Sequence, residues 1–140
     1  MIDARVFEAT EESCGLQLLH EQTTGRVVSA AIEVHRELGP GLLESAYLFC
    51  LCHELAVRKI AFRTEVPLPI DYKGVHLESG YRMDLVVEDK VAIELKSVDK
   101  ILPIHHAQLL TYLRLSRLRI GLLINFNVKH LRDGIVRKII

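Results

Sequence analysis

Two charged side chains interrupt an apolar stretch in the second half of the chain, where residues 91–97 read Val-Ala-Ile-Glu-Leu-Lys-Ser. Side chains alternate between the two faces of a β-strand, so Glu94 and Lys96 share one face with Ala92. Burying such groups in a central strand costs free energy unless they pair with one another or bind a metal ion. Glu94 and Lys96 are therefore the first candidates for a catalytic site.

A second carboxylate, Asp84, lies on the stretch before this strand. Residues 80–87 are expected to form a strand and residues 88–90 a tight turn, which together make a hairpin with the 91–97 strand. In that hairpin Asp84 and Glu94 lie at comparable heights. Their carboxylates, with the backbone carbonyl of Leu95, offer the hard oxygen ligands that Mg²⁺ prefers, and Mg²⁺ keeps several of its waters. The pattern predicts an open Mg²⁺ site, with Mn²⁺ as a substitute.

Lys96 has two interpretations in this hairpin. Beside a metal ion, its ammonium group orients or polarises an attacking water and stabilises charge on a phosphate. Without a metal ion, Asp84 or Glu94 forms a structural ion pair with Lys96 inside the sheet. The spacing alone leaves both interpretations open.

Two further patterns add polar groups to this part of the chain. Gln108 and Tyr112 are four residues apart on a helix that is expected to begin near Pro103, so they share one helix face. They can hydrogen-bond a lysine, a water or a phosphate, or they simply form the polar border of an amphipathic helix. Glu44 falls in the first turn of another predicted helix, where the helix dipole favours an acid. If that helix end faces the sheet, Glu44 adds a third carboxylate.

Apolar periodicity and chain breakers predict the elements that position these groups. Two helices are separated by the break Gly39-Pro40-Gly41, and the first has Thr23 or Thr24 as its N-cap. Pro67 and Pro69 indicate an edge or irregular strand. The predicted elements are helices at 24–38 and 42–59, an extended segment at 62–72 with 75–77 paired back on it, strands at 80–87 and 91–97, a helix from 103, and strands at 120–126 and 135–140.

Several blocks of the sequence resemble the GxxExxY protein family. Residues 41–47, Gly-Leu-Leu-Glu-Ser-Ala-Tyr, look like the motif that names it. The later blocks with the same resemblance are Tyr81-Arg82-Met83-Asp84, Glu94-Leu95-Lys96, Gln108 with Tyr112-Leu113, and residues 121–127. The resemblance covers about residues 20 to 140.

This family is assigned to the PD-(D/E)XK nuclease-like superfamily, and the resemblance implies its fold. That fold is α/β, with a restriction-endonuclease-like mixed central sheet flanked by helices, here in the order α-α-β-β-β-α-β-β. The implied site residues are Asp84 as the motif aspartate, Glu94 and Lys96 as the (D/E)XK pair, Glu44 as a helical acid, and Gln108 and Tyr112 as the QxxxY element of RecB-like exonucleases. Met83 stands where the superfamily name has proline.

Length and composition fit one domain. The chain has 140 residues, which we divide into an N-terminal extension at 1–20 and a nuclease-like domain at 21–140. It has 18 basic and 18 acidic residues, so the net charge gives no argument for nucleic acid. Residues 111–140, however, hold seven basic side chains and one acidic side chain. Such a basic end either faces phosphates or forms an ordinary solvated surface.

Cysteine usage and hydropathy indicate a cytoplasmic protein without a membrane partner. The three cysteines lack CxxC spacing, which favours reduced thiols. The acidic N-terminus lacks the apolar run of a signal peptide, and no apolar segment reaches the roughly 18–20 residues that span a bilayer. The edge strand expected at 62–72 offers a surface for pairing two copies, so a homodimer is one expectation.

These observations predict a Mg²⁺-dependent phosphodiesterase that hydrolyses nucleic acid, with DNA as the first candidate substrate. Asp84, Glu94, Glu44 and the Leu95 carbonyl would hold the metal ion. A catalytically silent binding or assembly module on a nuclease-like fold is the alternative from a different class. An RNA-cleaving enzyme with the same site is a third possibility.

Overall fold

A five-stranded mixed sheet forms the centre of the protein, with the strand order β1-β4-β5-β6-β7. The computed structural model describes residues 19–78 and 80–140, so the predicted extension at 1–20 lies almost entirely outside the described residues. β5 pairs antiparallel with β4 and parallel with β6, and the other neighbours are antiparallel. The strands of this sheet are β1 (Phe62–Pro67), β4 (Arg82–Val87), β5 (Val91–Lys96), β6 (Ile120–Asn125) and β7 (Ile135–Ile139).

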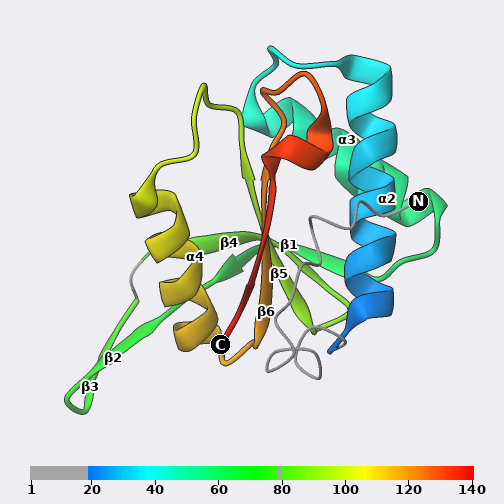
Figure 1. Ribbon diagram of the computed structural model, residues 1–140. Coiled ribbons are helices and arrows are strands. Elements are labelled where there is room, and N and C mark those ends of the chain that lie inside the picture. The colour runs from blue at the N-terminus through cyan, green and yellow to red at the C-terminus, as the bar shows by residue number, and fades with distance from the viewer. Residues whose placement is uncertain (1–18, 79) are drawn as a thin grey trace.

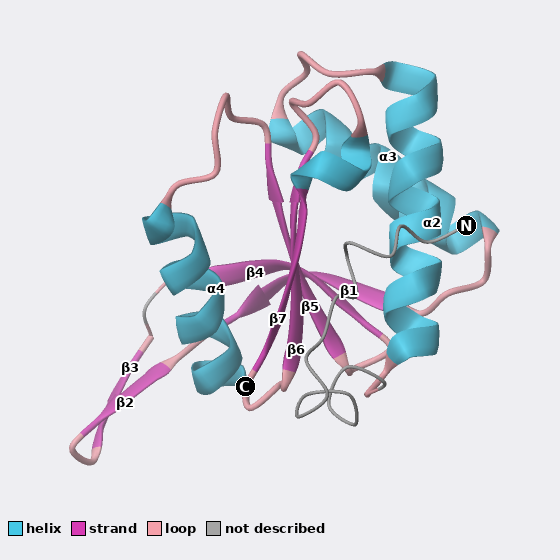
Figure 2. Cartoon of the chain, viewed as in Figure 1, coloured by secondary structure: helices cyan, strands magenta, loops and turns pink. Residues whose placement is uncertain are grey.

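Helices cover both faces of the sheet, as Figure 1 and Figure 2 show. α2 (Glu21–Leu38) and α3 (Glu44–Val57) pack on one face, and α4 (Pro103–Ser116) packs on the other. Alternation along β5 builds both layers, because Ile93 points to the α2–α3 side and Ala92 to the α4 side. The predicted α/β fold with a mixed sheet between helices is confirmed.

The strand β6 is buried on both faces, as its apolar run predicts. Gly121 on this strand lets α4 approach closely, because a Cβ atom there would lie 2.8 Å from Cδ1 of Leu109. β5 and β6 run in the same direction, so their carboxyl ends meet at one edge of the sheet. The loops that follow these two strands, and the beginning of α4, lie at that edge.

The predicted hairpin is present, and its turn is tight. Glu88 and Asp89 both have φ of 54°, which suits the backbone twist of a short hairpin connection. The Glu88 carboxylate accepts a hydrogen bond from Thr23 at 3.0 Å and pairs with Arg26. These contacts fasten the first turns of α2 to the hairpin.

The expected N-cap of the first helix is wrong. α2 begins at Glu21, with His20 at the N-cap position. The Thr23 hydroxyl reaches across to Glu88, and the Thr24 hydroxyl donates back to the Glu21 carbonyl at 3.0 Å. Both threonines therefore lie within the helix, and neither caps its N-terminus.

The extended segment expected at 62–72 divides into two strands. β1 ends at Pro67, and the chain then turns, with the Leu68 amide donating to the Tyr81 carbonyl at 2.9 Å. β2 (Ile70–Tyr72) pairs with β3 (Val75–Leu77) in a separate two-stranded sheet that projects from the body beside α4 (Figure 1). The described residues thus have one more strand than the sequence predicts, because pairing with β4 ends at Pro67 and the chain resumes at Ile70 as a separate strand.

None of the helices within residues 19–78 and 80–140 combines the length and the apolar character needed to cross a membrane.

The Tyr47 side chain organises the Gly-Pro-Gly break before α3. It is fully buried, and its ring stacks on Phe126 with 4.4 Å between centroids. Its hydroxyl donates to the Gly39 carbonyl at 2.6 Å and accepts from the Leu42 amide at 3.2 Å. The Leu42 carbonyl in turn accepts from the Ser97 hydroxyl at 2.5 Å. This chain of contacts holds the start of α3 against the end of β5.

We expect Tyr47→Phe to lower the free energy of unfolding by about 0.5–1.5 kcal/mol, because it removes two part-buried hydrogen bonds made by the Tyr47 hydroxyl. Urea denaturation followed by circular dichroism measures this change. Tyr72→Phe is the matched control, since Tyr72 is 66% exposed. Equal effects of the two substitutions would contradict the structural role of the Tyr47 hydroxyl.

Candidate active site

Asp84 and Glu94 meet where β4 and β5 stop pairing through their backbones. The paired residues end at Leu85 and Ile93, although both strands continue. Beyond that point side chains replace the backbone ladder. The Leu95 amide donates to Oδ2 of Asp84 at 2.8 Å, and the Asp84 amide donates to Oε1 of Glu94 at 3.1 Å. The two carboxylates are therefore fixed between the strands by reciprocal hydrogen bonds.

Burial and the repulsion between their negative charges favour a proton on the Asp84–Glu94 pair at neutral pH. Glu94 is only 5% exposed, and desolvation, followed by the charge of Asp84, raises its pKa to about 8. Desolvation also raises the pKa of Asp84, although the Leu95 amide and Lys96 act in the opposite direction. Two carboxylates that share a site cannot both ionise at low cost. A cation placed between them would remove this cost.

Lys96, Gln108 and Tyr112 form a hydrogen-bonded chain beside the carboxylates. Lys96 Nζ donates to Oε1 of Gln108 at 3.4 Å, and Nε2 of Gln108 donates to the Tyr112 hydroxyl at 3.0 Å. Burial, followed by the nearby charge of Glu94, raises the pKa of Tyr112. The helix face predicted from the four-residue spacing thus faces the strand that carries Glu94 and Lys96.

The backbone carbonyl of Leu95 faces the same place. In an extended strand the N–H and C=O groups of one residue point to the same neighbouring strand. The Leu95 amide points to Asp84 on β4, so its carbonyl also lies on the β4 side. The next carbonyl, that of Lys96, points to β6 and accepts from the Phe126 amide at 2.9 Å. Leu95 is therefore positioned to supply a third oxygen.

Glu44 is the acid that the structure does not join to this pair. It is the first residue of α3 and is exposed. In the part of the chain that the structure describes, no hydrogen bond or ion pair links it to Asp84 or Glu94. Within the same residues, no three His, Cys, Asp or Glu side chains gather closely enough to hold a metal ion. Two of the three predicted acids come together, and Glu44 as a metal ligand stays a prediction.

Glu65 is an acid near the site that sequence reasoning missed. It lies on β1 between Thr64 and Val66, which pair with the residues on either side of Asp84. Its charge contributes to the raised pKa of Asp84. Only the register between β1 and β4 places it there, and two strands that are twenty residues apart in sequence give no local signal of that register.

Asn125 is a second missed residue, and it positions the loop that follows Lys96. It is 2% exposed at the end of β6. Its side chain accepts from the Val98 amide at 3.1 Å and donates to the Val98 carbonyl at 2.9 Å. A buried asparagine that ends an apolar strand is a signal that the sequence does contain. Its effect is to hold the two loops at the site edge together.

The basic residues near the C-terminus mostly lie away from the carboxylates. Arg117 and Arg119 precede β6, and Lys138 pairs with Gly121 near the beginning of that strand. The site lies at the opposite end, because β5 and β6 are parallel and Lys96 ends β5. Only Lys129 and Arg132 follow β6 at the site edge. Of the two interpretations of the basic end, a solvated surface away from the carboxylates fits most of these residues.

Comparison with protein families agrees with this geometry. A family model described as the PD-(D/E)XK nuclease superfamily matches residues 21–138, which is most of the chain. Comparisons with curated proteins and with solved structures gave no significant match. The finer resemblance to the GxxExxY family stays a prediction. The structure has a mixed sheet between helices, with an aspartate and a Glu-x-Lys pair on adjacent strands. Since the family model also matches residues 21–138, the chain belongs to the PD-(D/E)XK nuclease superfamily.

Proposed function

We propose that this protein is a Mg²⁺-dependent nuclease that hydrolyses phosphodiester bonds in DNA. The observation that supports it best is the buried Asp84–Glu94 pair, held by reciprocal backbone hydrogen bonds next to Lys96. Two acids at the centre of a sheet destabilise the fold unless they bind something. A silent binding module would gain by replacing them with apolar residues, which disfavours that alternative.

The residues present fit a small, hard divalent cation. Mg²⁺ is commonly bound through one or two carboxylates, with waters and substrate phosphate oxygens in its other positions. Asp84, Glu94 and the Leu95 carbonyl would provide the protein's share. Glu44, at the start of α3, would act through a water molecule. Mn²⁺ takes the same oxygen ligands and would substitute.

Lys96 and its partners act on the reacting phosphate. A bound divalent cation supplies Lewis-acid stabilisation of the phosphate and makes water a better nucleophile. The Lys96 ammonium group, anchored by Gln108, stabilises the charge that develops on the phosphate and orients the attacking water. Tyr112 holds the Gln108 amide in place and so acts as a positioning residue.

The chemistry of this site is shared by DNA and RNA, because it addresses the phosphodiester group. We place DNA first and RNA second, and only a substrate assay separates the two. A homodimer through the edge strand β1 remains compatible with this proposal, since β1 has one free edge in the described sheet.

We expect purified protein to cleave DNA with Mg²⁺ or Mn²⁺ and to be inactive in EDTA. Asp84→Asn and Glu94→Gln should each lower the rate at least about 100-fold, because each removes a metal ligand. Gel assays with plasmid, linear, single-stranded and RNA substrates measure the rates.

Asp89→Asn in the turn of the same hairpin is the matched control, because the Asp89 side chain is 79% exposed and, among the residues that the structure describes, bonds only to Arg63. Its activity should equal that of the unmodified protein. An absence of cleavage under every condition, or full activity of the Asp84→Asn variant, would contradict the proposal.

Glu44→Gln should have a smaller effect than either core substitution, about tenfold or less, because this exposed acid acts through water. Titration of Mg²⁺ against the cleavage rate should show a weaker apparent affinity with a similar maximal rate. A loss as large as that of Asp84→Asn would mean that Glu44 binds the metal ion directly.

The carboxylate pair also predicts how stability depends on pH without metal. Burial, followed by the Asp84 charge, raises the Glu94 pKa from 4.5 to about 8 in the folded protein. The folded state therefore binds a proton that the unfolded chain releases above pH 4.5, and stability falls as the pH rises from there to about 8. In EDTA we expect a loss on the order of a few kcal/mol over this window.

Urea denaturation at several pH values measures this loss. Glu94→Gln should flatten the profile, and Mg²⁺ should restore stability at the alkaline end. Glu37→Gln, at a side chain 67% exposed on α2, serves as control and should leave the profile unchanged. A flat profile for the unmodified protein would show that the two acids are not desolvated together.

A further inference from the structure

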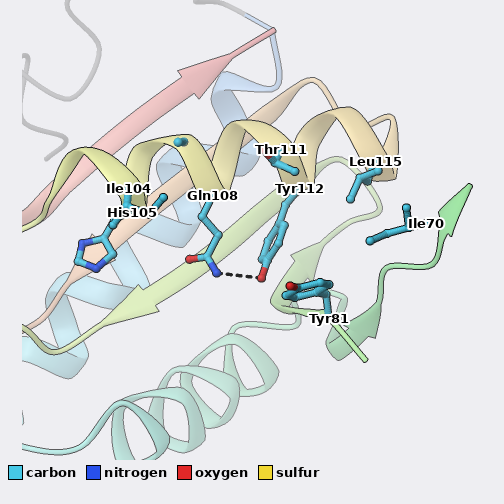
Figure 3. Close-up of a pocket in the computed structure, with 9 residues that line it drawn as sticks. Ile70, Tyr81, Ile104, His105, Gln108, Thr111, Tyr112 and Leu115 are labelled. Atoms are coloured by element: carbon cyan, nitrogen blue, oxygen red, sulfur yellow. Dashed lines mark hydrogen bonds between the residues drawn. The ribbon is translucent and has the colours of Figure 1, made fainter. Parts of the chain in front are cut away.

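A groove of about 600 Å³ runs along α4, and its lining includes Gln108, the hydrogen-bond partner of Lys96. Figure 3 shows His105 and Gln108 at one end, Tyr112 facing Tyr81 in the middle, and Leu115 with Ile70 at the other end. Through Gln108 and Tyr112, the wall of the groove is hydrogen-bonded to Lys96, which lies two residues after Glu94 on β5. A volume of this size is typical of sites for small organic groups.

The walls of this groove suit an uncharged flat group and not a phosphate. The described residues that line it include no lysine or arginine. Tyr81 is 53% exposed, and its ring lies 6.4 Å from that of Tyr112 at an angle of 53°. Ile104, on α4 next to His105, is 67% exposed. A half-exposed aromatic ring among aliphatic side chains is the kind of surface on which nucleobases stack.

The end of the groove near Lys96 adds directed polar groups. Nδ1 of His105 accepts from the Leu102 amide at 2.9 Å, which leaves Nε2 of the neutral ring as a hydrogen-bond donor. The Tyr112 hydroxyl accepts from Gln108 and keeps its own proton to donate. These groups match the acceptor atoms on a base edge.

We propose that this groove binds an unpaired nucleobase, stacked on Tyr81, of the strand whose phosphate lies at Asp84, Glu94 and Lys96. This inference rests on the proposed nuclease function and adds its substrate class, which is single-stranded or unpaired nucleic acid. In a duplex the faces of each base are covered by its neighbours, so the base enters such a groove only after leaving the stack. Single strands meet no such barrier.

The test is a binding measurement, so it does not depend on cleavage. Fluorescence anisotropy measures the affinity for three labelled probes: single-stranded dT12, the dT12–dA12 duplex and an abasic 12-mer. They present unpaired bases, paired bases and a backbone without bases, respectively. Ca²⁺ replaces Mg²⁺, and a gel verifies that the oligonucleotide stays intact. We expect dT12 to bind more tightly than the duplex or the abasic strand.

Tyr81→Ala should weaken dT12 binding about tenfold, and Tyr81→Phe, which keeps the ring, should bind as the unmodified protein does. The abasic strand should show no difference between these variants. Phe49→Ala is the matched control, because Phe49 is a 76% exposed aromatic residue on α3, across the sheet from α4. Thermal melting verifies that each variant is folded.

Two results would overturn the inference. One is equal affinity for dT12 and the abasic strand, and the other is an unchanged affinity in Tyr81→Ala. The outcome is separable from that of the nuclease proposal. Binding that depends on Tyr81, without metal-dependent cleavage, would support the base-binding groove and contradict the nuclease proposal. Cleavage of duplex and single strands at equal rates, unaffected by Tyr81→Ala, would support the nuclease proposal and contradict the groove.

Discussion

The exchange of hydrogen bonds between two buried carboxylates and the facing backbone is the interaction on which this site depends. Asp84 binds the amide of Leu95, and Glu94 binds the amide of Asp84, at the point where β4 and β5 stop pairing. Each acid thereby satisfies a backbone donor that the ladder would otherwise have used. The arrangement keeps the carboxylates in place without a cation, but it leaves them desolvated and close together. The fold therefore stores an electrostatic cost at this position, and a divalent cation would relieve it.

The surrounding edge is held by side chains that never touch the carboxylates. Asn125 bonds the loop after β5 through Val98, and Ser97 bonds the start of α3 through Leu42. Tyr47 closes the turn before α3 while it stacks on Phe126. A site of this kind needs rigid support, because a cation between two carboxylates tolerates little displacement of its ligands. Residues that resemble a functional motif, such as Tyr47, thus serve the site by fixing the loops around it.

The residues of the site that were predictable from sequence are those whose positions depend on short-range geometry within one helix or one hairpin. Alternation along β5 placed Glu94 and Lys96 on one face, and the tight turn after Val87 set the register that brings Asp84 beside Glu94. The four-residue spacing of Gln108 and Tyr112 likewise placed them on one face of a helix. The position of Glu65 next to the site depends on pairing between two strands that are distant in sequence. The groove at Tyr81 also depends on long-range packing, because Ile70 of β2 lies opposite α4 in its lining. The sequence left the position of the basic C-terminal residues open for a related reason, since that position follows from the direction of β6.

The charge distribution then constrains how a nucleic acid can be held. Most affinity of proteins for nucleic acid comes from neutralising phosphates with basic side chains. This chain has no net charge, and many of its C-terminal basic residues lie at the edge of the sheet opposite to Lys96. Under the proposed function, contact with the phosphates near the reacting bond would rest on a bound cation and the basic side chains at this edge, Lys96, Lys100, Lys129 and Arg132. Such a small electrostatic contribution makes weak general binding to duplex DNA the physical expectation. Additional affinity has to come from uncharged contacts, and the apolar groove along α4 is positioned to provide them.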